Sequence, residues 1–119
     1  MFSGLLQKMV ERIDGAEGAV IMGLDGIIVE RASLGGSEDL DLIAAECTSL
    51  LRNSVRTSSD TGLGELQELL MVTNQVTFVI KLLNPEYFVL LALDPGSNLG
   101  RARFELRKTQ LMLEQEFAT

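Results

Sequence analysis

The chain of 119 residues contains no histidine, no tryptophan and a single cysteine. The absence of histidine removes the commonest general base and the commonest metal ligand of proteins. One cysteine excludes an internal disulfide, fits a reducing compartment, and cannot form a metal site by itself. Apolar runs fall short of the roughly 20 residues that span a bilayer, and we expect no signal peptide. These absences predict a cytoplasmic protein that does not insert into membranes.

Positive charge is also scarce. Ten Lys and Arg residues stand against 17 Asp and Glu residues, which gives a net charge of −7. Such a balance keeps a protein soluble and argues against nucleic acid or an anionic membrane as its main partner. With 46% apolar and 23% charged residues, the composition is typical of a folded domain. We therefore expect residues 1–119 to form one domain, which buries about two-thirds of its unfolded surface.

The most informative stretch is 37–60, which predicts a helix of about six turns. Ser37 is a good N-cap, acidic residues follow it, and Arg52 and Arg56 come near the end, as the helix dipole favours. Helical spacing places seven residues on one apolar face that should pack on the rest of the protein: Leu40, Ile43, Ala44, Cys47, Leu50, Leu51 and Val55.

The opposite face of this helix carries small, weakly charged residues instead of the long charged side chains usual on a solvated face. They are Ala45, Thr48, Ser49, Asn53 and Ser54. Because small side chains allow another backbone to come close, we expect this face to meet a partner.

The other segments predict short strands and two further helices. Residues 65–72 are ambiguous, since their composition also favours a helix, but Gly62 and Gly64 would break one, and we prefer a strand. The predicted elements are a helix at 2–14, strands at 19–22 and 27–31 around a turn at 23–26, the long helix, strands at 65–72, 76–83 and 87–93, and a last helix capped by Ser97 or Asn98. This α-β-β-α-β-β-β-α order predicts an α+β sandwich with a five-stranded antiparallel sheet.

Candidate chemical groups favour structural roles. Cys47 lies on the apolar face, where a free cysteine is usually a small hydrophobe. The acidic pairs, Asp39 with Asp41 and Glu65 with Glu68, are explained better by helix-end charge or a solvated edge than by a metal site. The glycine clusters match neither GxGxxG nor the phosphate-loop pattern. We therefore expect a non-enzymatic interaction module without a cofactor or metal.

The order of the segments resembles the roadblock / dynein-light-chain family. The resemblance rests on GAVIMGLDGIIVERA at 18–32, on the long helix from Leu40 to Ser59, and on the stretch 76–108, in which Asn98, Gly100 and Arg101 close the pattern. It covers essentially the whole chain.

The resemblance implies a five-stranded antiparallel sheet between the long helix and the two terminal helices. It also implies a homodimer that pairs through the third strand and the long helix, with an interface at Thr48, Glu65, Leu66, Gln67, Leu69 and Met71. Bacterial members of the mutual gliding-motility protein B type act on a small Ras-like GTPase, without supplying an arginine finger. On this resemblance Ala45, Ser49, Arg52, Asn53 and Arg56 would bind the GTPase, as an activator or as a scaffold.

A second hypothesis is a small-ligand sensor with a pocket between sheet and helix. Such a pocket needs convergent polar groups within an apolar cleft. The strands offer only Thr73, Thr77 and Tyr87. A monomer at micromolar concentration would count against the homodimeric regulator, and a pull-down that asks whether a GTPase is retained would discriminate between the two hypotheses.

Overall fold

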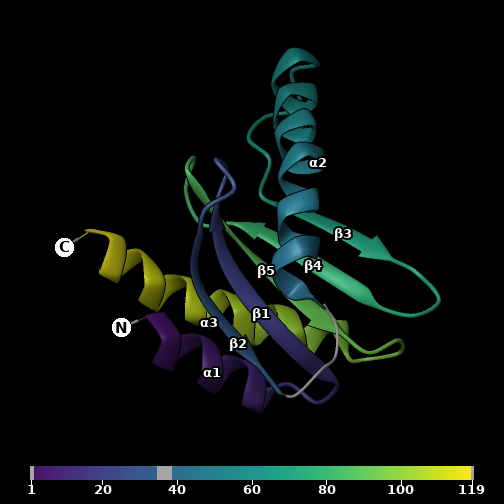
Figure 1. Cartoon of the computed structure of the whole chain (residues 1–119). Helices are drawn as coiled ribbons and strands as arrows, with labels where there is room; N and C mark the ends of the chain where they lie inside the picture. The colour runs from purple at the N-terminus through teal and green to yellow at the C-terminus, as the bar shows by residue number, and fades with distance from the viewer. Residues whose placement is uncertain (1, 35–38, 119) are drawn as a thin grey trace.

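A computed structural model describes residues 2–34 and 39–118 and shows three helices and five strands (Figure 1). In chain order they are α1 (Phe2–Arg12), β1 (Ala16–Gly23), β2 (Ile28–Ser33), α2 (Leu40–Asp60), β3 (Glu68–Val72), β4 (Thr77–Leu82), β5 (Tyr87–Leu93) and α3 (Leu99–Ala118). The predicted order of helices and strands and the α+β class are confirmed. Phe2 and Phe117 were expected on the apolar faces of the first and last helices, but their side chains are not among those that the structure describes.

All strands form one antiparallel sheet in the order β2-β1-β5-β4-β3. The central strand β5 is buried from Phe88 to Leu93, as expected of a nearly continuous apolar run with packing on both faces. The chain makes tight connections between β1 and β2 and between β4 and β5, whereas α2 carries it across to β3 at the far edge. The sheet therefore ends in β2 on one side and β3 on the other.

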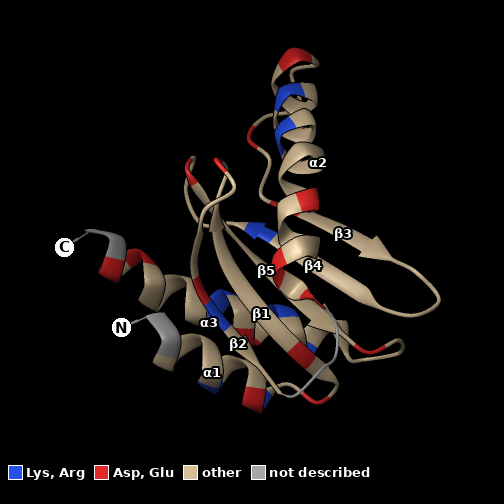
Figure 2. Cartoon of the chain, viewed as in Figure 1, with Lys and Arg blue, Asp and Glu red and all other residues tan. Residues whose placement is uncertain are grey.

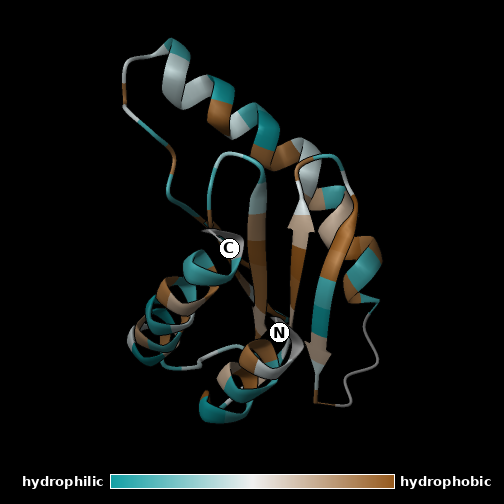
Figure 3. Ribbon diagram, turned by 90° about the vertical axis from the view of Figure 1, so that its left-hand side faces the viewer, coloured by the Kyte–Doolittle hydropathy of each residue, from teal (hydrophilic) through white to brown (hydrophobic). Residues whose placement is uncertain are grey.

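The two faces of the sheet are covered unequally. Helices α1 and α3 lie side by side on one face, and α2 crosses the other (Figures 1 and 3). Strand alternation divides the core accordingly: Ile21, Val89 and Leu91 point to the α1–α3 side, and Val20, Ile80 and Leu90 to the α2 side. The C-terminal half of α2 projects beyond the sheet (Figure 1).

The ends of α2 follow ordinary capping chemistry. The Asp39 carboxylate accepts a hydrogen bond from the Leu42 amide at 3.2 Å and is the N-cap. The predicted cap, Ser37, lies outside the described residues. At the other end Gly62 has φ of 72°, in the left-handed region that glycine adopts readily, so the predicted stop near residues 61–64 is confirmed.

Some predicted boundaries are wrong. The third strand begins at Glu68, so residues 65–67 belong to the connection from α2, although the Gln67 carbonyl still accepts a bond from the Leu82 amide. Strand β1 starts three residues earlier than predicted, at Ala16, and β2 continues to Ser33. The last helix is capped by Asn98, whose side chain accepts from the Arg101 amide at 3.0 Å.

Gly18 allows α2 to pack closely on β1. A Cβ atom at this position would lie 2.5 Å from Leu40 Cδ1 and 2.8 Å from the Ala32 carbonyl oxygen of β2. The leucine methyl can move, but the backbone oxygen is held by the sheet. Only glycine therefore lets the start of α2 and strand β2 approach β1 this closely.

We expect Gly18→Ala to lower the free energy of unfolding by about 1–3 kcal/mol, the usual cost of overpacking a filled site. The matched control is Gly4→Ala in α1, where an added Cβ meets nothing within 4 Å. This control should be neutral or stabilise by up to about 1 kcal/mol. Urea unfolding of both variants measures the difference, and equal stabilities would contradict the close-approach role of Gly18.

Candidate interaction surface

The outward side of α2 carries the residues predicted to bind a partner. Ala45, Ser49 and Asn53 are all exposed and follow one another at four-residue spacing. The exposed Arg56 guanidinium donates to Asn53 Oδ1 at 2.8 Å. The structure therefore brings these four residues together on one accessible strip of the helix.

Arg52 lies beside this strip but is already engaged. Its guanidinium donates to the Leu24 carbonyl in the turn between β1 and β2. The Leu24 amide in turn donates to the Glu86 carbonyl, which ties the β4–β5 turn to the same place. The last turn of α2 contains no basic residue, and Arg56 lies within the turn before it, in keeping with its predicted place near the helix end. Arg52 instead holds the helix to the hairpin.

Two predictions about the faces of α2 are wrong. Thr48 was expected on the outer face and at the dimer interface, but it is only 4% exposed, and its hydroxyl donates to the Ala45 carbonyl at 2.6 Å. Leu50 was expected against the sheet, yet it is 40% exposed. The buried stripe runs through Ala44, Cys47, Thr48, Leu51 and Ser58. Threonine can take an inward position because its hydroxyl bonds to the preceding helical turn.

The edge strand β3 offers unpaired main-chain groups. In the register of the two strands, Leu69 lies opposite Ile80 and Met71 opposite Phe78. Main-chain hydrogen bonds flank these pairs, from the Leu82 amide to the Gln67 carbonyl and from the Thr73 amide to the Val76 carbonyl. Since such pairs alternate along an antiparallel ladder, the odd-numbered residues of β3 are the ones hydrogen-bonded to β4. The amides and carbonyls of Glu68, Leu70 and Val72 consequently point away from the sheet. No other strand of the described residues pairs with this edge.

Side chains of β3 alternate between the two faces. Leu69 and Met71 are half-buried and pack at the margin of the α2-side core. Leu70 and Val72 are exposed, and Glu68 accepts two bonds from the Arg103 guanidinium of α3, at 2.9 and 3.1 Å. Sequence reasoning missed Leu70 and Val72, although strict alternation with Leu69 and Met71 would have identified them.

The α2 side of the sheet is incompletely covered. Nine partly buried apolar residues surround its core, against four on the α1–α3 side, among the described residues. They are Leu24, Ile28, Leu40, Ile43, Leu66, Leu69, Met71, Val76 and Leu82. Leu42 and Leu50 add exposed apolar surface on α2 itself. Leu42 was missed because it lies off the predicted apolar face, whereas Leu50 was assigned to that face and is exposed instead.

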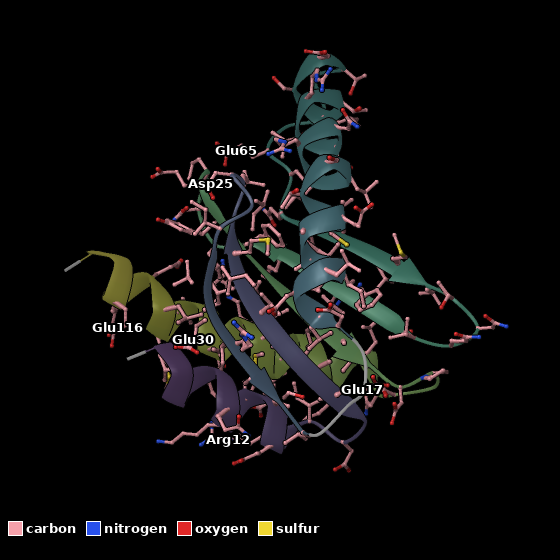
Figure 4. The ribbon with its side chains drawn as sticks, viewed as in Figure 1. Arg12, Glu17, Asp25, Glu30, Glu65 and Glu116 are labelled. Carbon is pink, nitrogen blue, oxygen red and sulfur yellow. The ribbon has the colours of Figure 1, made fainter. Side chains whose placement is uncertain are left out.

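The acidic residues weighed as a metal or acid–base site have structural partners. Asp39 caps α2, Asp41 pairs with Arg31 of β2 at 3.0 Å, and Glu68 is held by Arg103. Glu65 stands apart from Glu68 in the α2–β3 connection. Figure 4 shows Glu65 and Asp25 at the end of the sheet from which α2 projects.

A groove of about 780 Å³ runs beside the C-terminal end of α2. It lies between that end, the connection to β3, the β4–β5 turn and α3, with Ser58, Glu65, Lys81 and Arg107 among its lining residues. The polar residues predicted for a ligand pocket, Thr73, Thr77 and Tyr87, do not line it. The Thr73 hydroxyl serves the β3–β4 turn, where it donates to the Val76 carbonyl.

The family follows from a comparison with known proteins. The sequence model of the Roadblock/LC7 domain family matches residues 3–93 of this chain. The chain belongs to the Roadblock/LC7 family. Among the described residues, no helix of this Roadblock/LC7 chain has both the length and the hydrophobicity to cross a bilayer.

Solved structures of Roadblock/LC7 proteins have the same fold. MglC from Myxococcus xanthus is 31% identical, with a TM-score of 0.70 over 95% of this chain and 96% of that chain. MglB from Myxococcus xanthus is 12% identical, with a TM-score of 0.90 over 98% and 94%. An MglB described as having a tetrameric arrangement is 15% identical, with a TM-score of 0.84 over 94% and 84%.

Cys47 is a packing residue of the α2-side core. Burial raises the pKa of its thiol above the ordinary value of 9.0, and the neighbouring Glu46 carboxylate raises that pKa further. Because only the thiolate reacts, these two effects suppress its nucleophilicity at neutral pH.

We expect Cys47 in the native protein to react with a disulfide reagent at pH 7.5 at least roughly tenfold more slowly than in the urea-unfolded protein. The native rate should rise only as the pH passes the raised pKa. Stopped-flow absorbance of the thiol released from the reagent gives both rates. Equal rates in the two states would show an accessible, ordinary thiol.

Proposed function

We propose that this Roadblock/LC7 protein is a non-catalytic homodimer that regulates or serves as a scaffold for a small Ras-like GTPase. The observation that supports self-association is the half-covered sheet face beside a free strand edge. A helix is about 10 Å wide and strands lie about 4.8 Å apart, so one helix covers roughly two strands of five. The opposite face has two helices; this face has one.

A second copy supplies what is missing. Pairing β3 with β3 satisfies the outward groups of Glu68, Leu70 and Val72, and brings a second α2 over the incompletely covered face. Leu66, Leu69 and Met71 then become buried, together with the flanking Glu65 and Gln67. Such an interface is expected to bury on the order of 2,000 Å² or more, the size of an obligate contact. The tetrameric arrangement described for one MglB is in keeping with self-association.

Leu70→Pro tests the strand pairing directly. Proline removes an amide that points to the free edge and spares the bonds to β4, and edge strands tolerate proline for that reason. We expect the variant to be monomeric at micromolar concentration by light scattering, with its circular dichroism retained.

The control is Leu70→Ala, which loses the side chain but keeps the amide, and it should remain a dimer. A dimeric Leu70→Pro protein, or a monomeric wild type, would reject pairing through β3.

The GTPase is proposed to dock on the surface formed by the two α2 helices. Ala45, Ser49 and Asn53 permit close backbone approach, with Arg56 beside them. Arg52 donates to the Leu24 carbonyl, which agrees with a regulator that repositions GTPase groups and does not insert an arginine. Such a docking mode serves an activator and a scaffold equally well.

Ser49→Arg should abolish GTPase binding and leave the dimer intact, because a long cation would hold the two backbones apart. Biolayer interferometry against the small Ras-like GTPases of the source organism, each loaded with GDP or a GTP analogue, measures the loss. Gln115→Arg on exposed α3 is the charge-matched control and should bind as the wild type does. Unchanged affinity of Ser49→Arg would remove the α2 strip from the proposal.

A second candidate function is ligand sensing through the groove beside α2. Its volume of about 780 Å³ falls within the range of small-molecule sites, and its lining mixes apolar and polar residues. Because Glu65, Leu66 and Gln67 both line the groove and adjoin the proposed dimer edge, a ligand there would couple to dimerisation. A metabolite that raises the melting temperature and shifts the dimer equilibrium would favour this function.

A further inference from the structure

Helix α3 carries apolar residues both on the side that packs on the sheet and on the side that faces solvent. Its inner side packs on the sheet and α1 through Ala102, Leu106 and Leu113. Its outer side exposes Phe104 by 58%, Leu111 by 51% and Met112 by 44%. With Lys108, these residues follow the i, i+4, i+7, i+8 spacing of a single helical stripe. Phe104, Lys108, Leu111 and Met112 are called the outer α3 stripe below.

The stripe contains one cation, Lys108, and three more border it, in an otherwise acidic protein. Arg101, Arg103, Arg107 and Lys108 are four of the ten Lys and Arg residues of the chain, within eight positions. Figure 2 shows positive charge along α3. Arg103 is engaged with Glu68 of β3, but Arg107 forms no ion pair with any other described residue. This local excess contrasts with the net charge of −7.

A buried carboxylate holds two of the cations beside the aromatic ring. The Glu105 side chain is 1% exposed and pairs with Arg101 Nη2 at 3.1 Å and with Lys108 Nζ at 3.3 Å. The same Arg101 and Lys108 lie 5.8 and 5.5 Å from the centre of the Phe104 ring, within cation–π range. Glu105 therefore holds both cations near the Phe104 ring before a partner binds, which lowers the entropic cost of binding.

We propose that the outer α3 stripe docks an acidic amphipathic helix of a partner protein. The stripe is about 12 Å long, the length of two helical turns, and matches the apolar face of a helix laid against it. Acidic residues on both borders of that helix would meet Arg101, Arg107 and Lys108. An anionic membrane is a poorer match, because a protein of charge −7 is repelled from such a surface overall.

This surface is separate from the proposed dimer and GTPase surfaces. Helix α3 lies on the sheet face opposite α2 (Figures 1 and 3). The protein could therefore hold a second partner while it is paired through β3. The proposal stands independently of the GTPase proposal.

The probe is a synthetic helical peptide with leucines at i, i+3, i+4 and i+7 and glutamates on both borders. Fluorescence anisotropy should show salt-sensitive binding of this peptide to the chain of residues 1–119. Phe104→Ser and Arg107→Glu should each weaken binding roughly tenfold or more, since central aromatic and arginine residues dominate such contacts. Neither residue is buried, so both variants should keep the wild-type melting temperature.

The matched control is Lys8→Glu, a charge reversal on exposed α1, which should bind as the wild type does. A peptide with lysines in place of the glutamates should not bind. The proposal is overturned if the acidic peptide fails to bind, or if Lys8→Glu weakens it as much as Arg107→Glu. It is also overturned if phosphatidylserine-rich vesicles bind the protein and Phe104→Ser abolishes that binding. The same holds if Phe104→Ser abolishes self-association and leaves peptide binding unchanged.

Discussion

One helix cannot cover one face of a five-stranded sheet. Two helices at the usual separation of 8–10 Å are needed, and the α1–α3 side has them. The α2 side has one, which crosses the sheet and then projects beyond it (Figure 1). The half-buried Leu66, Leu69 and Met71 follow from this shortage, and so does the accessible edge of β3. The proposed homodimer is the simplest arrangement that removes both exposed features, since one copy supplies the missing helix and the missing strand together.

The position of α2 is set by contacts that the rest of the fold provides. Gly18 lets its first turn approach β1, Asp41 pairs with Arg31 on β2, and Arg52 reaches the turn after β1. All three contacts involve the β1–β2 hairpin, so the helix is oriented from one side of the sheet. Its outer strip and the β3 edge are thereby left accessible at the other side. The arrangement separates the residues that hold α2 from those proposed to bind partners.

Much of this fold could be predicted from the sequence, because strong local signals coincide with it. The apolar run of β5, the glycines after α2 and the segment order each have a direct physical cause. The orientation of α2 was harder, since Thr48 is polar and buried while Leu50 is apolar and 40% exposed. A hydroxyl that bonds its own helix can replace a hydrophobe, and a leucine can remain exposed where a partner is expected. Residues 65–67 were assigned to a strand because pattern alone does not show where pairing with β4 begins. The cations around Phe104 were visible in the sequence, but their arrangement by Glu105 needed the structure.

Amide hydrogen exchange along β3 tests the central claim most directly. In an isolated chain the outward amides of Glu68, Leu70 and Val72 face solvent, whereas those of Leu69 and Met71 are bonded to β4. If β3 pairs with β3 of a second copy, the outward amides should become protected as the protein concentration rises, to the level of their inward neighbours. Fast exchange at Leu70 and Val72 at every concentration, with Leu69 and Met71 protected, would contradict the account.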